Sequence, residues 1–282
     1  MTKNKEDKKG EDGPHLTEEE EQEVGQRSAP RTEVVYEAIR EEGENELSRS
    51  SPTLFWDGLT AGLSMGFSLV AEGLLRAGLP ETSWRPLIAK LGYAFGFLMV
   101  VMGRQQLFTE NTLTVILPLL QRFDAKTLKH VLRLWAVVLI ANLVGAFAFA
   151  YTIGHTEIFR PEVREAFSHI GLEGLEGGWW TLLLRGVFAG WLIALMVWML
   201  PAAESLRPVI VIFMTYLVAL GGFSHIVVGS VEIFYLITTG AASWGEYFRW
   251  LVPVLLGNIL GGVTIVAVLG HAQVVSEENS KI

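Results

Sequence analysis

A single histidine stands in the middle of a strongly apolar stretch of the chain. His225 lies in GGFSHIVVGSVEIFY, residues 221–235, with no acidic or basic residue within six positions on either side. An ionisable side chain at membrane depth is costly and usually marks a functional site. This imidazole could offer a proton or a charge-assisted hydrogen bond to a small anion, or it could be a neutral group bonded to backbone carbonyls. A metal role is not expected, because no second histidine and no carboxylate lies at ligand spacing.

A polar interruption also breaks the apolar run that ends near residue 103. The stretch GRQQLFTENTLTVILP, residues 103–118, brings charged and amide side chains to membrane depth. Irregular backbone is tolerated there only where protein or a cavity satisfies its polar groups. We expect one half-helix to start at about Thr112 and another at about Ile226, with their free N–H groups facing the centre. Helix N-termini favour negative charge, so this arrangement suits an anion.

Six apolar runs long enough to cross a bilayer would position these groups. They occupy residues 55–79, 87–103, 128–154, 180–200, 208–222 and 247–270. Thr109 precedes Asn142 by 33 residues, and His225 precedes Asn258 by the same interval. We therefore predict an all-α membrane protein with six transmembrane helices in two inverted three-helix repeats, the second and fifth helices being broken. The pseudo-two-fold axis of that repeat is expected to relate Thr109 to His225.

The motif GLSMG, residues 62–66, admits two interpretations. Together with GVFAG, residues 186–190, it places two glycines four positions apart, so that neighbouring helices can approach closely. It also matches the G-x-S-x-G pattern of serine hydrolases, in which Ser64 would be the nucleophile and His225 its base. That nucleophile needs a strand followed by a strained turn. Because the motif lies within a continuous apolar run, helix packing is favoured, and we expect no catalytic residue and no enzyme activity.

Charge is concentrated near the start of the chain. Residues 1–50 carry 8 Lys/Arg and 15 Asp/Glu, whereas the whole chain is 50% hydrophobic and only 18% charged. We expect residues 1–50 to be an acidic, largely disordered tail, residues 51–272 a transmembrane channel domain and residues 273–282 a short tail. Within the first tail, residues 32–48 could form an amphipathic helix, either solvated or interfacial, or else a lid over a cytoplasmic opening. No basic patch indicates a nucleic-acid partner.

The distribution of basic residues indicates an orientation. The segment 121–133 is rich in arginine and lysine, whereas the segment 155–178 is mostly acidic. Loops rich in arginine and lysine tend to remain in the cytoplasm. We therefore expect the segment 121–133 to be cytoplasmic. With an even number of crossings, both termini would then be cytoplasmic as well.

Several of these motifs together resemble the formate/nitrite transporter family. The resemblance rests on LFTENTLT, ANLVGA, LMVWM, GFSH and LGNILGG, and it covers about residues 52–272. It implies an aquaporin-like fold of six helices with two broken ones. It also implies a multi-pass protein of the bacterial inner membrane that assembles as a homopentamer, with a pore in every protomer. Family members pass small monovalent anions of weak acids, such as formate or nitrite, and no cofactor is expected.

The resemblance also assigns residues to the pore. The central pore histidine of the family falls on His225, and its loop threonine falls on Thr109. The hydrophobic constrictions fall on Leu107, Phe108 and Val218. The other pore residues expected are Asn111 in the first break and Gly229 after the histidine. The chain departs from the family at Gln106, where an acid is usual, at Val228–Gly229, where Ala-Asn is usual, and at Gly190, where an asparagine is usual.

These observations predict a channel or transporter for a small weak-acid anion. Half-helix N-termini would draw the anion in, and Leu107 with Phe108 would form an apolar ring that a bare anion crosses at a cost of several kcal/mol. His225, aided by Thr109, would lower that cost and would take a proton only when the anion is present. Two alternatives stay open, a non-conducting membrane scaffold or sensor with a degenerate pore and an intramembrane serine hydrolase.

Overall fold

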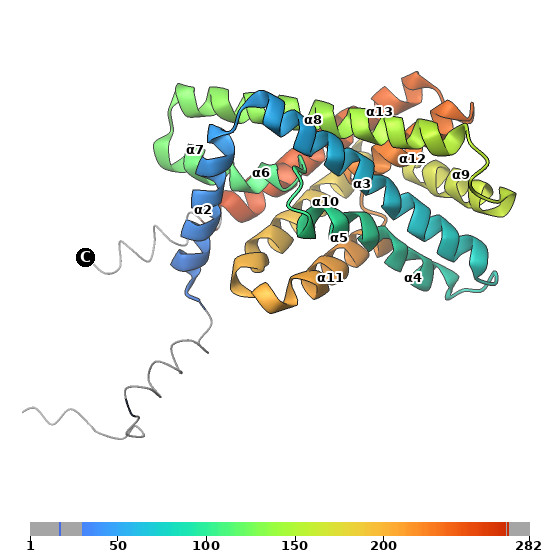
Figure 1. The fold of residues 1–282 in the computed structure, drawn as a ribbon, viewed down its shortest axis with the longest axis horizontal. Coiled ribbons are helices and arrows are strands. Elements are labelled where there is room, and N and C mark those ends of the chain that lie inside the picture. The colour runs from blue at the N-terminus through green and yellow to red at the C-terminus, as the bar shows by residue number, and fades with distance from the viewer. Residues whose placement is uncertain (1–16, 18–29, 269, 271–282) are drawn as a thin grey trace, which may run out of the picture. The chain divides into compact units, whose positions relative to one another are not determined.

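The computed structural model describes Thr17, residues 30–268 and Gly270, and all the regular structure in these residues is helical (Figure 1). Of the acidic tail expected at residues 1–50, only Thr17 and the part from residue 30 onward are therefore described. The short tail expected at residues 273–282 lies outside the described residues. The described residues from Thr32 onward form one compact unit.

In the part of the chain that the structure describes, four helices are long and apolar enough to cross a membrane, namely Ser51–Gly78, Arg85–Met102, Ala125–Gly154 and Trp179–Ala202. They correspond to α3 (Ser51–Gly78), the run α4 (Arg85–Ala89), η1 (Lys90–Tyr93) and α5 (Ala94–Met102), α8 (Ala125–Gly154), and α10 (Trp179–Met199) with η2 (Leu200–Ala202). The starts of α3 and α8 follow from the local sequence, because a side chain caps each of them. The Ser50 side chain accepts a hydrogen bond from Thr53 N at the start of α3, and Asp124 caps α8 in the same manner. Such caps satisfy N–H groups that have no partner within the helix.

Shorter helices complete the structure. The apolar runs expected at 208–222 and 247–270 appear as α11 and as α13 continued by η4. A capping box of Ser243 and Glu246 begins α13. The bounds of the remaining elements are α2 (Thr32–Ser48), α6 (Asn111–Thr114), α7 (Ile116–Arg122), α9 (Pro161–Leu175), η3 (Glu204–Leu206), α11 (Arg207–Leu220), α12 (Ile226–Thr238), α13 (Trp244–Leu260) and η4 (Gly261–Val268).

The two most extensive helix contacts are those of α3 with α8 and of α10 with α13 (Figure 1). Glycine makes both possible. A Cβ atom on Gly62 would lie 2.1 Å from the Asn142 carbonyl oxygen, and one on Gly190 would lie 2.3 Å from the Asn258 carbonyl oxygen. The glycine of α3 that corresponds to Gly190 is thus Gly62. The similar motifs at residues 62–66 and 186–190 are therefore not equivalent segments but are offset by four positions, and Gly66 packs against the Phe149 ring.

The half-helix α12 lies at the centre of the structure. Eleven consecutive residues, from Ile226 to Leu236, are buried. The surrounding helices are α8, α9, α3 and α13. Of these helices, α9 is not among the six apolar runs expected from the sequence. It buries Val163, Phe167 and Ile170. Because α12 is enclosed on several sides, any polar side chain that it carries must find a partner or face a cavity.

The helix at residues 32–48 packs on the protein. It contacts α6 and α7, which together form the second half of the broken second run. Gly43 allows this approach, since a Cβ atom there would lie 2.1 Å from the Thr114 carbonyl oxygen. The apolar face of α2 is thus buried against protein and is neither solvated nor in contact with lipid. The residues buried on that face are Val35, Tyr36, Ile39, Gly43 and Leu47.

Candidate functional site

The two helix breaks meet at a hydrogen bond between His225 and Thr109. The His225 Nε2 and Thr109 Oγ1 atoms are 2.7 Å apart. Both side chains are buried, with exposed fractions of 1% and 0%. The Phe97 ring packs edge-on against the imidazole at a centroid distance of 4.9 Å. The imidazole is therefore held in one orientation by contacts from two other segments of the chain.

The bonds of His225 define its tautomer. Its Nδ1 atom accepts from the backbone N–H groups of Val227 and Val228, each at 3.3 Å, so His225 is the N-cap of α12. An acceptor nitrogen carries no proton, so in the neutral ring the proton is on Nε2, which donates to Thr109 Oγ1. A second proton would have to bind Nδ1 and displace both N–H groups. The site therefore favours hydrogen-bond donation by a neutral His225 over proton donation, contrary to the sequence-based expectation that His225 takes a proton when the anion is present.

Two asparagines hold the two breaks in the same way. Asn142 Nδ2 donates to the carbonyl oxygens of Gly58 and Gln106, and its Oδ1 accepts from Phe108 N. Asn258 Nδ2 donates to the carbonyl oxygens of Gly186 and Ser224, and its Oδ1 accepts from Ile226 N. The six distances lie between 2.8 and 2.9 Å.

These bonds correct the expected correspondence between the breaks. Gln106 and Phe108 occupy the places of Ser224 and Ile226, so the residue that matches His225 is Leu107 and not Thr109. Thr109 lies two positions later and reaches the imidazole from the other break. Thr109 and His225, which stand 33 residues before Asn142 and Asn258, thus touch each other but are not equivalent positions of the two breaks.

A cavity of about 300 Å³ reaches the imidazole from one side. Its wall includes His225, Gly229 and Glu232 from α12, which are spaced by four and three residues and so lie on one helix face. Trp250 of α13 closes the wall beside Gly229, where a Cβ atom would lie 2.4 Å from the Trp250 ring. The family's usual asparagine would not fit at Gly229 with the indole in this position.

Apolar side chains lie around the His225–Thr109 contact but do not line the cavity. Leu107, Phe108 and Val218 have exposed fractions of 0%, 1% and 0%. None of them belongs to the cavity wall, and neither does Thr109. In this conformation the cavity therefore ends at the imidazole, next to a closed apolar region.

Asn111 has a different place from the other expected pore residues. Its Nδ2 atom donates to Gln106 Oε1 at 2.9 Å and to the Leu107 carbonyl oxygen at 3.1 Å. Its backbone oxygen accepts from Trp135 Nε1 at 3.0 Å. The amide is used within the break, so Asn111 positions Leu107 and does not offer a free group to a ligand.

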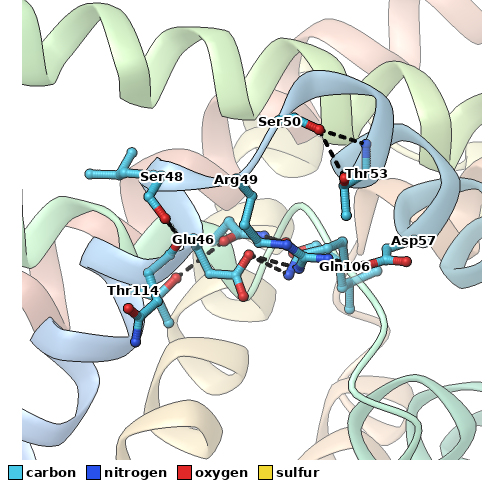
Figure 2. A network of polar contacts seen from close by, with 12 residues as sticks. Glu46, Ser48, Arg49, Ser50, Thr53, Asp57, Gln106 and Thr114 are labelled. Atoms are coloured by element: carbon cyan, nitrogen blue, oxygen red, sulfur yellow. Dashed lines mark hydrogen bonds and ion pairs between the residues drawn. The ribbon is translucent and has the colours of Figure 1, made fainter.

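Gln106 connects the first break to α2 (Figure 2). Its Nε2 atom donates to Glu46 Oε2 at 2.8 Å. Arg49 binds the same Glu46 carboxylate at 3.0 Å and also pairs with Asp57 at the start of α3. An acid at position 106, as is usual in the family, would face the Glu46 carboxylate without a donor. The glutamine therefore fits the presence of α2 at this place.

The structure also places the side chains that flank the first break and Ser64 of α3. Among the described residues, Arg104 and Glu110 form no ion pair with each other, and Glu110 Oε1 is buried without a hydrogen-bond partner. Arg104 instead adopts a left-handed backbone conformation with φ 50° where α5 has ended. Ser64 lies within the continuous helix α3, so the strand and strained turn of a serine hydrolase are not present around it.

An all-helical chain with long apolar helices, a buried imidazole and a cavity leading to it has the features of a membrane transport protein. The sequence matches the family model described as formate/nitrite transporter over residues 33–272. The chain belongs to the formate/nitrite transporter family.

Individual relatives agree with this assignment. The chain is 42% identical over 256 residues to the inner membrane protein YfdC of Escherichia coli (strain K12), covering 90% of this chain and 83% of that protein. It is 28% identical over 244 residues to the formate channel BtFdhC of Bacillus thuringiensis, covering 83% and 92%. Among solved structures, a pentameric formate channel with formate bound matches with a TM-score of 0.69 and 21% identity, over 80% of this chain and 98% of that one. A second, described as an FNT family ion channel, matches with a TM-score of 0.74 and 18% identity, over 85% and 98%. At these identities the two structures support the fold.

Proposed function

We propose that this protein is a channel or transporter for small monovalent anions of weak acids, of the formate and nitrite type. The observation that carries the proposal is the 2.7 Å contact of His225 Nε2 with Thr109 Oγ1 at the end of a cavity, where two helix breaks meet. The names of relatives as formate channels support the substrate class.

In this proposal the chain crosses the membrane six times, as two inverted three-helix units. The matched hydrogen bonds of Asn142 and Asn258 support the repeat, and so do the matched helix pairs α3 with α8 and α10 with α13. The protein would lie in the bacterial inner membrane with both termini cytoplasmic. A homopentamer is proposed from the pentameric formate channel of similar fold.

The buried groups would work in sequence. An anion enters the cavity and reaches His225, beyond which Leu107, Phe108 and Val218 form the apolar constriction. Burying an anion among such side chains is costly unless it is hydrogen-bonded. The Nε2–H of His225 can donate that bond to the anion once its own bond to Thr109 Oγ1 breaks. Alternatively, the Thr109 hydroxyl donates to the anion while its oxygen still accepts from Nε2–H. Gly229 leaves room beside the imidazole, and Asn111 keeps Leu107 in place.

A scaffold without a pore and a serine hydrolase are not favoured. Relatives of this chain are named as channels and transporters, and Ser64 lies within the continuous helix α3.

Purified protein in liposomes tests the proposal. We expect uptake of formate, nitrite or acetate above that of empty liposomes, and a loss of at least roughly tenfold in His225→Ala. Because His225 also caps α12, His225→Asn is the matched control: asparagine can cap the helix but lacks the Nε2–H donor. Loss in both variants supports the role of the imidazole. No uptake of any small anion by the wild-type protein would contradict the proposal.

A further inference from the structure

A buried carboxyl group without a partner, that of Glu232, lies in the wall of the cavity that ends at His225. Glu232 has an exposed fraction of only 8%, and it lines the cavity. Among the described residues, no hydrogen bond or ion pair is made by its carboxyl group, whose Oε2 lies against Gly174 of α9, 3.2 Å from where a Cβ atom there would be. A buried polar side chain without a partner is uncommon in folded proteins and requires an explanation.

The charged groups facing Glu232 from the neighbouring elements are already engaged or lie at the rim. Lys90 of η1 pairs with Glu72 of α3 at 2.6 Å, and Arg76 of α3 pairs with Glu173 of α9 at 2.7 Å. The rim holds Glu176 and Arg185, and the other titratable groups nearby are Tyr93 of η1, Tyr247 of α13 and His225 of α12. From α8, residues 134–150 contribute no titratable side chain.

Position along α12 connects this carboxyl group to the imidazole. Glu232 is seven residues after His225, which corresponds to two helical turns and to a rise of about 10 Å on one face. Gly229 lies between them on the same face and has no side chain to separate them. An ion that moves along this wall passes the carboxyl group before it reaches the imidazole. His225 itself has Nδ1 engaged in the helix cap, so it is poorly placed to supply a proton.

We propose that Glu232 is the group that protonates the anion in the cavity, an inference that rests on the proposed function. A buried carboxylate without a paired cation is costly, so before an anion arrives the site favours the neutral acid form of Glu232. When a weak-acid anion arrives, the O–H bond of the Glu232 carboxyl breaks and an O–H bond forms on the anion. The products are the Glu232 carboxylate and the neutral acid, which crosses the apolar constriction. A hydronium ion from the cavity water then returns the proton to Glu232 and leaves one water molecule.

This role of Glu232 predicts which anions are transported. Anions of weak acids, such as formate and acetate, can accept the proton, whereas anions of strong acids, such as chloride and nitrate, cannot. The carboxylate left after transfer would also repel a second anion. The cavity is therefore expected to select weak-acid anions by their basicity and not by their size alone.

Formate uptake into liposomes at pH 7.5 and pH 5.5 tests the proposal with full-length protein. We expect Glu232→Gln to reduce uptake at pH 7.5 at least roughly tenfold relative to the wild-type protein, and to come within about twofold of it at pH 5.5, where solution supplies more of the neutral acid. Glu232→Asp should retain most activity. Glu173→Gln is the matched control, since it removes a carboxylate from the same cavity wall but one that is paired with Arg76. Size-exclusion chromatography of each variant confirms that it folds and assembles.

The outcomes separate this inference from the proposed function. If the wild-type protein takes up no small anion, the proposed function fails. If the wild-type protein transports formate and Glu232→Gln shows the same pH profile, the role of Glu232 is overturned while the pore stands. Faster uptake by Glu232→Gln at both pH values would also overturn it, because the carboxylate would then be a barrier to anions. Equal uptake of nitrate and formate by the wild-type protein would contradict selection by basicity.

Discussion

Asn142 and Asn258 make the same three hydrogen bonds at the two helix breaks. Each side-chain amide donates to a carbonyl oxygen of the helix packed against it and to a carbonyl oxygen in the break. Each also accepts from a backbone N–H that lies two residues after that break carbonyl. Both side chains are fully buried. The pair therefore fixes the two breaks against α3 and α10, and it determines where the imidazole and Thr109 meet.

Replacement of either asparagine should destabilise the protein by a similar amount. Asn142→Ala and Asn258→Ala each remove three hydrogen bonds to backbone groups, at a cost of roughly 3 kcal/mol. In a chain of this size we expect the melting temperature in detergent to fall by roughly 5–10 °C. Asn45→Ala, at an exposed position of α2, is the control and should change it little. A drop confined to one of the two buried variants would argue against their equivalence.

The Thr109 hydroxyl should matter more for transport than for folding. Thr109→Val keeps the shape of the side chain but leaves the Nε2–H of His225 without its acceptor in a buried site. We expect formate uptake to fall by roughly 5- to 100-fold, which corresponds to about 1–3 kcal/mol. Thr109→Ser keeps the hydroxyl group and should retain most of the rate. Equal rates for the valine and serine variants would remove the hydroxyl from the mechanism.

Much of the site could be predicted from the sequence because its signals are local. Glycines, serine and histidine interrupt an apolar run at residues 221–225, and α12 begins at Ile226 as expected. The first break closes with a turn through residues 108–110, so its helix starts at Asn111, one residue before the expected position. Spacing alone could not separate contact from equivalence, which is why Thr109 was matched to His225.

Other features depended on tertiary contacts. Glu232 lies seven residues from His225, just beyond the window within which the sequence shows no charge, and only the cavity reveals that both face the same space. The packing of α2 could not be predicted, because it depends on a close approach of Gly43 to a backbone carbonyl oxygen of α6, a segment far away in the sequence. Helix α9 had a detectable signal in Val163, Phe167 and Ile170, whose spacing is that of one helix face.

The contact between α2 and the first break should respond to charge at position 106. Gln106→Glu removes the donor to Glu46 and brings two carboxyl groups together at a partly buried place. Hydrogen exchange of α2 should accelerate by roughly 5- to 100-fold, which corresponds to a local destabilisation of about 1–3 kcal/mol. Adding Glu46→Gln restores one donor and one acceptor and should return exchange towards that of the wild-type protein. Failure of this second change to rescue would show that the 2.8 Å bond does not hold α2 in place.

Asp124 should make stability depend on pH in the acidic range. Hydrogen bonds from the backbone and hydroxyl of Thr127 lower the pKa of the Asp124 carboxyl below its ordinary value of about 3.9, aided by Lys126 N and by the nearby charge of Arg122. A lowered pKa means that the carboxylate stabilises the start of α8 above that ordinary value. The contribution is lost as the pH falls through the lowered pKa.

Thermal unfolding between pH 3 and pH 6 measures this effect. Asp124→Asn keeps a capping acceptor but cannot titrate, so the difference in melting temperature between it and the wild-type protein should shrink as the pH falls below about 4. A difference that stays constant over this range would show that the Asp124 charge does not contribute.

Formate uptake by liposomes that contain the wild-type protein, His225→Asn or Thr109→Val, with protein content and oligomeric state matched, directly tests the role of the contact between His225 and Thr109. We expect rapid uptake by the wild-type protein and a loss of at least roughly fivefold in both variants, because each removes one side of the 2.7 Å contact between the two breaks. Uptake by all three proteins at the same rate would contradict the central role of that contact.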